Sequence, residues 1–299
     1  MSMAVLIPGG TGQLGRELAT RAPEGADVRA PGSADLDITN AGAVVEAVKS
    51  LAGSASLPPV VINAAAYTAV DAAEEDANRA FAVNADGPRV LAAACSAHDV
   101  PLIHVSTDYV FPGDADSPYE TDDELGPRSV YGVTKAAGEE AVLGSGARAW
   151  VVRTAWVYGA HGSNFVKTMA RLAGERAELS VVDDQRGSPT WTGDLATGLL
   201  ELAGFVAAGK EPPTVLHATG GGDTTWCGLA RAVFEELGLD PARVKPATTA
   251  DYPRPAARPA FSVLSGAAWR SAGLTPLRPW REALTAAFAD DGAAYRAQP

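Results

Sequence analysis

Two side chains that can move a proton, Tyr131 and Lys135, lie four residues apart in the middle of the chain. Residues at this spacing share one face of a helix, so the two side chains are neighbours. A free tyrosine has a pKa of about 10, and a nearby ammonium group lowers it by about 1–3 units. We therefore expect the Tyr131 phenol to protonate a developing alkoxide, a role that contributes about 10²–10⁴ in rate.

Thr107 follows an apolar run, residues 102–106, that we expect to form a strand. Its hydroxyl is a neutral donor for the substrate oxygen that Tyr131 protonates. Lys135 can also bond the ribose of a nicotinamide cofactor and so orient the ring. An exposed Tyr/Lys pair without catalytic meaning is the alternative, and such pairs are frequent in helices. Together the three residues favour hydride and proton transfer between a nicotinamide and a C–OH/C=O pair.

A glycine-rich turn near the start of the sequence spaces Gly9, Gly12 and Gly15 three residues apart. The turn follows an expected strand and opens an expected helix. Glycine lets a backbone approach a pyrophosphate closely, and the free N–H groups at a helix start attract phosphate. We expect these glycines, with Gln13 and Leu14, to bind a dinucleotide; a purely structural turn is the alternative.

The choice of nicotinamide cofactor depends on the residues after the second expected strand. Chains that bind NAD usually place a carboxylate there, against the ribose 2′-hydroxyl. Here the first carboxylates are those of Asp35 and Asp37, so nothing repels a 2′-phosphate, and Arg29 or Ser33 could contact one. We therefore predict NADPH as the cofactor, with NADH left open.

Two further segments are expected to contact the cofactor. Asp37 and Ile38 stand where a loop could meet the adenine. Asn63, Ala64 and Ala65 follow a third apolar run, and their small size lets the chain pass close to a ribose. Asn63 could also pin this strand end to the next one by a backbone hydrogen bond. Ordinary loop residues and a small-residue strand exit are the alternatives.

Short apolar runs alternate with longer amphipathic runs, an order that predicts a parallel sheet covered on both faces. The predicted fold class is α/β, a Rossmann-type doubly wound parallel sheet with a smaller C-terminal substrate-binding region. We place the dinucleotide-binding domain at 1–160 and the substrate-binding region mainly at 161–299, with interleaving allowed. The expected strands are residues 4–8, 28–30, 60–65, 102–106, 149–154 and 214–219; the expected helices are residues 12–21, 40–51, 76–98, 130–143, 164–176, 193–208, 225–237 and 279–288; and the expected loop is residues 247–262.

The bulk composition limits the partners. The 299 residues carry a formal net charge of −12, which argues against nucleic acid and anionic membranes. Cys95 and Cys227 fit neither a zinc spacing nor a disulfide framework, and no pattern of His, Asp or Glu predicts a metal site. The N-terminus lacks a signal peptide and no apolar run reaches about 20 residues, so we expect a cytoplasmic protein.

The sequence resembles the dTDP-4-dehydrorhamnose reductase family, within the extended short-chain dehydrogenase/reductase superfamily. Matching segments, such as HVSTDYVFP and VYGVTKAAGE, lie in both halves of the chain, at residues 12–15, 61–74, 104–112, 130–139, 153–159, 164–172, 182–190 and 258–265. The resemblance implies NADPH-dependent reduction of a dTDP-linked 4-ketosugar, dTDP-4-dehydro-L-rhamnose, at C4. It implies Thr107, Tyr131 and Lys135 as the catalytic set, and as contacts of the sugar nucleotide Val70, Asp71, Tyr109, Trp156, Asn164 and Arg258.

Several alternatives stay open at this point. The substrate could be another dTDP-4-keto-deoxysugar, in a dihydrostreptose or antibiotic-sugar pathway. A non-catalytic NADP-binding regulatory subunit is an alternative that the intact Thr107, Tyr131 and Lys135 argue against. A dehydratase is disfavoured because Tyr109 stands after Asp108, where such enzymes carry a second carboxylate. Some family members bind magnesium at a dimer interface through glutamates that we do not place in this sequence, so we assign no metal residues and leave magnesium and a homodimer open.

Overall fold

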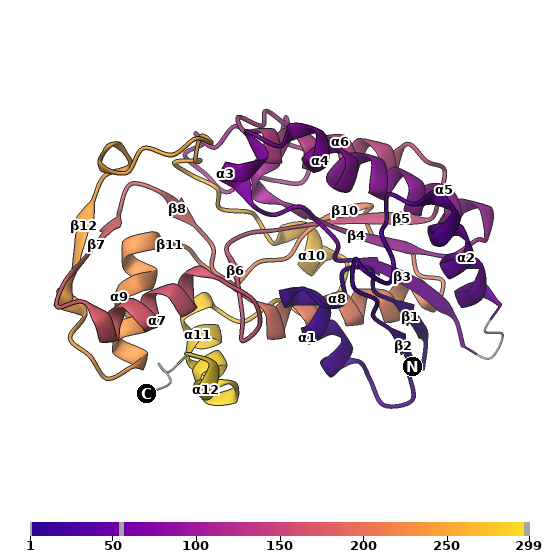
Figure 1. Cartoon of the computed structure of the whole chain (residues 1–299). Helices are drawn as coiled ribbons and strands as arrows, with labels where there is room; N and C mark the ends of the chain where they lie inside the picture. Colours follow the sequence, from indigo (N-terminus) through magenta and orange to yellow (C-terminus); the bar gives the residue numbers. More distant parts are fainter. Residues whose placement is uncertain (1, 54–56, 296–299) are drawn as a thin grey trace.

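A six-stranded parallel sheet forms the centre of the molecule (Figure 1). The computed structural model describes residues 2–53 and 57–295. The strand order is β10-β5-β4-β3-β1-β2, with every neighbouring pair parallel. The strands are β1 (Ala4–Leu6), β2 (Asp27–Arg29), β3 (Pro59–Asn63), β4 (Leu102–Thr107), β5 (Ala149–Thr154) and β10 (Val215–His217). All six carboxyl ends therefore meet at one edge of the sheet, where side chains from different strands can form a site.

Helices cover both faces of this sheet, which confirms the predicted doubly wound Rossmann-type fold (Figure 1). Because β3 is buried on both sides, its residues Val60, Val61 and Ile62 are apolar throughout instead of alternating with polar ones. One face packs against α2 (Ala41–Ala52), α5 (Gly87–Ala97) and α6 (Val130–Leu143), and the other against α1 (Gln13–Arg21) and α8 (Thr192–Ala207).

The single helix predicted at residues 76–98 is interrupted by a wider turn. Helix α4 (Ala77–Phe81) leads into a π-helical turn, η1 (Ala82–Asp86), before α5 begins. Within this turn the Asn84 amide bonds both backbone groups of Tyr67, at 2.8 and 3.0 Å, and the Thr134 hydroxyl at 3.1 Å. The π turn thus ties α6 to the loop that follows β3, as such turns often do near functional sites.

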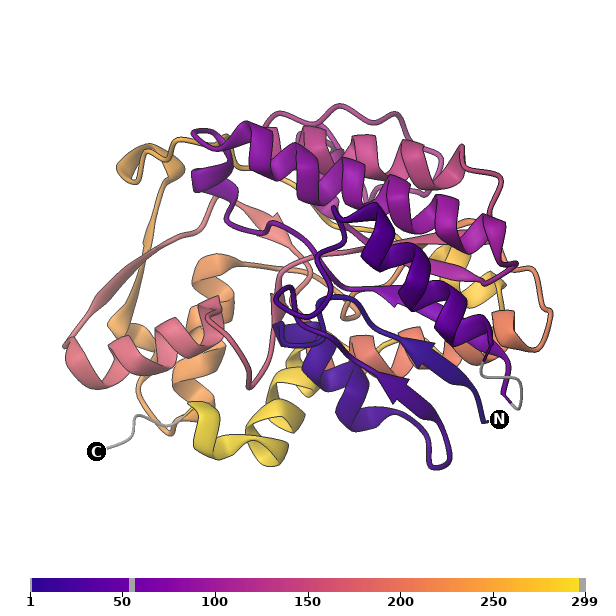
Figure 2. The same cartoon turned by 45° about the vertical axis from the view of Figure 1, so that its right-hand side comes forward.

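The C-terminal region gathers beside the sheet layer, as the orange and yellow helices of Figure 2 show. A parallel strand pair, β7 (Leu179–Val182) with β12 (Val244–Ala247), was not predicted; Pro246 lies inside β12 and masks the strand pattern. The predicted loop 247–262 begins where β12 ends and contains one short 3₁₀ turn, η4 (Thr249–Asp251). The helices here are α7 (Phe165–Glu175), α9 (Trp226–Glu236), α11 (Trp280–Asp290) and α12 (Gly292–Tyr295).

The two halves of the chain are woven together. Strand β10 and helix α8 come from beyond residue 160, yet they belong to the sheet layer; the domain division itself stays a prediction. Two further pairs of two-residue strands form between distant segments. These are β6 (Val157–Tyr158) with β9 (Thr190–Trp191) and β8 (Arg186–Gly187) with β11 (Thr224–Thr225). The remaining short elements are α3 (Val70–Ala73), η2 (Asp108–Val110), η3 (Pro241–Arg243) and α10 (Ala267–Ser271).

No helix in the described part of the chain has the length and apolar character that crossing a membrane requires.

Candidate active site

A cleft of about 520 Å³ opens at the carboxyl edge of the sheet, beyond β3, β4 and β5. Eleven residues singled out in the sequence line it, and they come from both halves of the chain: Gly12, Gln13, Leu14, Ala64, Val70, Thr107, Tyr109, Tyr131, Lys135, Trp156 and Asn164. The lining does not include the other eight, which are Gly9, Gly15, Asp37, Ile38, Asn63, Ala65, Asp71 and Arg258.

The three glycines of the first turn are required for different structural reasons. Gly9 has a φ of +81°, and a Cβ there would lie 2.6 Å from the Ala65 nitrogen. A Cβ on Gly15 would lie 2.2 Å from the Gly9 carbonyl oxygen, so this position is packed against the turn itself. Gly12 caps α1 and, with Gln13 and Leu14, faces the cleft. No side chain caps this helix start, so its N–H groups fit a dinucleotide pyrophosphate.

The exit of β3 is held by a side chain. Asn63 accepts a hydrogen bond from the Ala65 nitrogen at 3.1 Å, and its amide nitrogen lies 3.0 Å from His104 Nδ1. Asn63 therefore meets the neighbouring strand β4 through its side chain, and it also stands opposite His104 in the β3–β4 ladder. The Ala64 nitrogen bonds the Pro8 carbonyl at 3.1 Å, and Ala64 is the member of this trio that lines the cleft.

Asp37 and Ile38 lie away from the cleft. Ile38 is 3% exposed and packs in the core between the sheet and α5. The Asp37 carboxylate accepts bonds from the Thr39 nitrogen and hydroxyl, at 2.9 and 2.8 Å, which lowers its pKa. Contact with the adenine stays a prediction for both residues.

Thr107 and Tyr131 face each other across the cleft. Thr107 ends β4, and Tyr131 stands in the first turn of α6, whose N-terminus the Ser129 hydroxyl caps at 3.1 Å. The Tyr131 ring packs edge-on against Tyr109, with ring centroids 5.5 Å apart. Burial raises the pKa of Tyr131 to about 12, and the Thr107 hydroxyl opposes that shift. The raised value is opposite to the lowering that the Tyr-Lys spacing led us to expect.

Lys135 has other partners in this structure. Its ammonium nitrogen donates to the Val105 carbonyl oxygen at 2.7 Å and lies 3.3 Å from His104 Nε2. Burial lowers the pKa of Lys135 to about 8, and the Glu139 carboxylate opposes that change. Burial and the Lys135 charge also hold the pKa of His104 well below its ordinary value. His104, which is fully buried, is the side chain that meets Lys135.

Two residues on the far wall connect the cofactor turn to the C-terminal region. Asn164 caps α7 and donates to Gln13 Oε1 at 2.7 Å and to the Gly159 carbonyl at 2.8 Å. Trp156 adopts a positive φ of 47° and stacks on Trp226, with ring centroids 3.5 Å apart. One face of the Trp156 ring is therefore covered by the Trp226 ring. Trp156 also lines the cleft.

Beside the cleft, an ion pair brings the loop 247–262 to helix α3. Arg258 donates to Asp71 Oδ2 at 2.8 Å, and the Ala256 nitrogen lies 3.3 Å from Asp71 Oδ1. The neighbouring Glu74 accepts from the Val130 nitrogen at 2.9 Å. Asp71 and Glu74 thus hold this loop and the start of α6, respectively.

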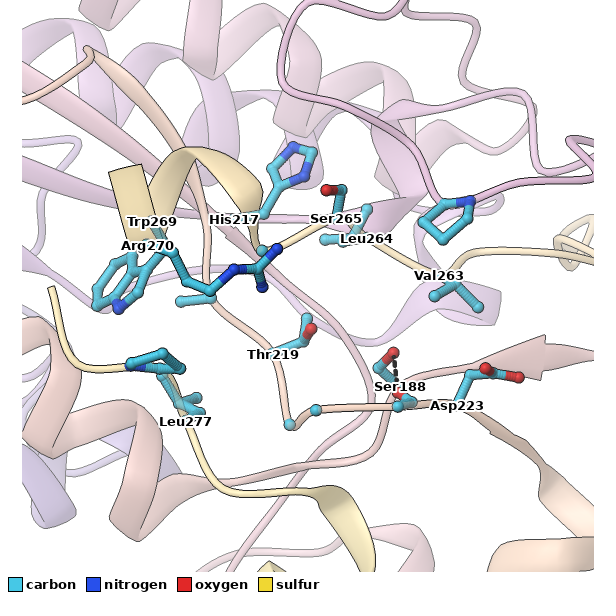
Figure 3. A pocket seen from close by; sticks show the side chains of 17 residues that line it. Ser188, His217, Thr219, Asp223, Val263, Leu264, Ser265, Trp269, Arg270 and Leu277 are labelled. Atoms are coloured by element: carbon cyan, nitrogen blue, oxygen red, sulfur yellow. Dashed lines mark hydrogen bonds between the residues drawn. The ribbon is translucent and has the colours of Figure 1, made fainter. Parts of the chain in front are cut away.

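A second cavity, of about 300 Å³, lies beyond the end of β10 (Figure 3). Ser188 donates to the Gly222 carbonyl at 2.8 Å there, and the Arg270 side chain extends across the cavity. None of the predicted site residues lines it. Within residues 2–53 and 57–295, no group of three or more His, Cys, Asp or Glu side chains is placed to hold a metal ion.

The sequence reasoning missed two buried carboxylates, one in the cleft lining and one behind it. Asp108, 2% exposed, accepts the Thr107 hydroxyl at 2.9 Å. Glu139 pairs with Arg153 at 2.7 Å behind Lys135. Glu139 is four residues after Lys135, and this repeated spacing on one helix face was the signal available in the sequence.

Three comparisons place the chain among known proteins. A family model described as RmlD substrate binding domain matches residues 3–292. The chain is 50% identical to dTDP-4-dehydrorhamnose reductase of Streptomyces griseus, over 95% of this chain and 92% of that protein. It is 49% identical to a probable dTDP-4,6-dihydroxy-2-methyloxan-3-one 4-ketoreductase of Streptomyces antibioticus, over 96% of this chain and 95% of that protein.

Among solved structures, dTDP-4-dehydrorhamnose reductase from Bacillus anthracis in complex with NADP superimposes with a TM-score of 0.90. The two sequences are 35% identical, and the match covers 97% of this chain and 100% of the other. On this likeness in sequence and fold, the chain belongs to the dTDP-4-dehydrorhamnose reductase family.

Proposed function

We propose that this protein uses NADPH to reduce the C4 ketone of dTDP-4-dehydro-L-rhamnose, giving dTDP-L-rhamnose. The observation that carries the proposal is one cleft lined both by the uncapped start of α1 and by Thr107, Tyr131 and Lys135. Family membership supports the substrate, and the NADP bound to the Bacillus anthracis relative supports the cofactor. The reaction converts the ketone, NADPH and one proton into the alcohol and NADP⁺.

Each residue has a defined task in this reaction. NADPH supplies the hydride when it is bound. The N–H groups at the start of α1 bind its pyrophosphate, and Lys135 binds its nicotinamide ribose. The Tyr131 phenol gives its proton to the alkoxide that forms at C4, while Thr107 donates a hydrogen bond to the same oxygen. With the ribose in place, the Lys135 charge stabilises the Tyr131 phenolate that remains.

The sugar nucleotide occupies the part of the cleft lined by Val70, Tyr109, Trp156 and Asn164. Trp156 and Tyr109 offer flat amphipathic rings for a sugar face, with Val70 beside them and Asn164 as a polar contact. A diphosphate carries negative charge, and this chain has a net charge of −12, so it requires a local cation. Arg258, held by Asp71 at the cleft border, supplies that cation.

A second candidate substrate is another dTDP-4-keto-deoxysugar. The Streptomyces antibioticus relative, whose name specifies a different ketosugar, is as similar in sequence as the rhamnose enzymes. The chemistry at C4 is the same in both cases. The intact Thr107, Tyr131 and Lys135 favour a catalyst over a non-catalytic NADP-binding subunit.

Loss of NADPH absorbance tests the proposal. The ketosugar is generated in place from dTDP-4-dehydro-6-deoxyglucose and a 3,5-epimerase, and the protein is added with NADPH or NADH. We expect oxidation of NADPH that is reduced about 10²–10⁴-fold in Tyr131→Phe, because the proton donor is lost. Tyr131→Phe should still bind NADPH. NADPH binding without oxidation by the unmodified protein would overturn the assignment and favour another ketosugar or a regulatory subunit.

We further propose a cytoplasmic enzyme that acts as a homodimer, in keeping with its small-molecule substrate and its family. Mass measurement in solution tests the dimer, and cell fractionation tests the location.

A further inference from the structure

The single hydrogen of the Thr107 hydroxyl is already used within the protein. A threonine hydroxyl donates one hydrogen bond and accepts two. Here it donates to Asp108 Oδ1 at 2.9 Å and accepts from the Tyr109 nitrogen at 3.2 Å. The Tyr131 phenol is its other polar neighbour, and the Thr107 hydroxyl opposes the rise that burial causes in the pKa of that phenol. In this arrangement Thr107 has no hydrogen left for a substrate oxygen, although its proposed role requires one.

Asp108 is the group that decides this arrangement. Its carboxyl is 2% exposed, and no Lys, Arg or His in the described part of the chain forms an ion pair with it. Its Oδ2 atom has no hydrogen-bond partner of good geometry among those residues. An unpaired buried carboxylate is costly, so the neutral acid is favoured at this position. Burial accordingly raises the pKa of Asp108 to about 6, opposed by the Ser262 and Thr107 hydroxyls.

We propose that Asp108 is a positioning residue whose protonation state sets the direction of the Thr107 hydroxyl, and so whether Thr107 can donate to the ketone. When Asp108 is ionised, the Thr107 hydrogen points to the carboxylate and the Tyr131 hydrogen points to Thr107. When Asp108 is protonated, the acid donates to Thr107 Oγ1, and the Thr107 hydrogen turns to the substrate oxygen. Tyr131 is then free to protonate that oxygen. The inference rests on the proposed function and extends it.

Several other titratable groups lie near Asp108 and Thr107. Their titration must be distinguished from that of Asp108. Tyr131 and Lys135 face it from α6, and burial moves their pKa values to about 12 and about 8. His104 on β4 is neutral because burial lowers its pKa far below 6.5. Burial raises the pKa of Tyr109, and the nearby Arg258 and Asp71 charges have opposite effects on that pKa. Between pH 5 and pH 7.5, Asp108 is therefore the group of this set that changes charge.

The test is the pH profile of ketosugar reduction by the complete protein with saturating NADPH. We expect kcat to fall as the pH rises through about 6, approaching tenfold for each pH unit. In Asp108→Asn, an amide N–H group replaces the acid as the donor to Thr107, so this fall should be absent between pH 5 and pH 7.5. The later fall near pH 8, from Lys135, should persist. Asp122→Asn, an exposed carboxyl of the loop before α6, is the matched control and should keep the full profile.

Thr107→Val keeps the proposal testable if Asp108→Asn does not fold. It removes the hydroxyl that connects Asp108 to the substrate, so its remaining activity should not change with pH below 7.5. An unchanged profile in Asp108→Asn, or in Thr107→Val, would overturn the inference while the proposed reductase activity stands. Absence of ketosugar reduction at every pH in the unmodified protein would instead overturn the proposed function.

Discussion

At the scale of residues, Tyr131 and Lys135 share a face of α6 but contact different partners. The Lys135 ammonium nitrogen bonds the Val105 carbonyl, while the Tyr131 phenol meets Thr107. The sequence spacing was sufficient to predict that both residues lie on one helix. It could not predict their ionisation, because burial depends on segments distant in the sequence, including the loop that brings Ser262 next to Asp108.

Arg258 offers a test of substrate binding at this scale. Arg258→Lys keeps a positive charge but loses the planar fork that suits a diphosphate. We expect KM for the ketosugar nucleotide to rise about tenfold, equivalent to about 1.4 kcal/mol, with little change in kcat. Steady-state kinetics measure both constants. The control is Arg89→Lys, an exposed residue of α5 whose ion pair with Asp86 lies outside the cleft; equal effects of the two variants would contradict the assignment.

At the scale of elements, helix α6, which carries Tyr131 and Lys135, is fixed by a buried ion pair. Arg153 on β5 bonds both Glu139 carboxylate oxygens, at distances from 2.7 to 3.1 Å, and bonds the Thr121 carbonyl at 3.1 Å. Its Nη1 atom also lies 3.4 Å from His217 Nε2 on β10. The pair thereby joins α6, two strands and the loop before α6, and it places a negative charge behind Lys135.

Glu139→Gln leaves the Arg153 charge buried without its partner. We expect the free energy of unfolding to fall by about 3–5 kcal/mol, measured by urea denaturation. Glu175→Gln is the matched control, because Glu175 pairs with Arg171 on the exposed surface of α7. Its removal should cost less than about 1 kcal/mol. A similar cost for both variants would show that the buried pair does not fix α6.

Gly15→Ala tests the packing of the glycine turn against α1. The added Cβ would lie 2.2 Å from the Gly9 carbonyl oxygen, so the turn must shift. We expect NADPH affinity, measured by fluorescence titration, to fall at least about tenfold. Gly174→Ala in α7, where a Cβ meets nothing within 4 Å, should leave affinity unchanged and add about 0.5–1 kcal/mol of stability. Unchanged NADPH binding in Gly15→Ala would contradict this role.

The elements themselves were largely predictable. Helix α6 and strand β5 have the bounds expected from the sequence, since an apolar pattern and a capping serine define α6 locally. The π turn at Asn84 was not predictable, because the Asn84 amide bonds the hydroxyl of Thr134, which is fifty residues away. The two-residue strands β6 and β9 likewise form only because distant segments meet.

At the scale of the whole molecule, the cleft joins two regions that interleave in sequence. Asn164 bonds Gln13 across the cleft, and Arg258 bonds Asp71 beside it. Both contacts link residues more than 150 positions apart, so no local pattern could reveal them. The resemblance over nearly the whole chain predicted site residues in both regions, and residues from both regions line the cleft.

Stability of the molecule should depend on pH through its buried histidines. Burial lowers the pKa of His217 to about 3 and that of His104 well below 6.5. The unfolded chain therefore binds more protons below pH 6.5, so stability falls as the pH drops. Asp108 acts in the opposite direction below pH 6, because its pKa is raised. Two histidines outweigh one carboxyl, and we expect a net loss of about 2–3 kcal/mol between pH 7 and pH 5.

Thermal denaturation at pH 7 and pH 5 measures this change. A Tm at pH 5 equal to or above that at pH 7 would mean that the two histidines are not held neutral in the folded protein.

The central claim is that hydride is delivered to C4 of a dTDP-ketosugar in the cleft that Tyr131 lines. The most direct measurement is transfer of deuterium from NADPH deuterated at nicotinamide C4, with the product examined by NMR. We predict dTDP-L-rhamnose that carries one deuterium at C4. The Tyr131→Phe variant should form this product far more slowly than the unmodified protein. Deuterium at another carbon would contradict this proposal. Recovery of unreduced ketosugar from a protein that binds NADPH would contradict it as well.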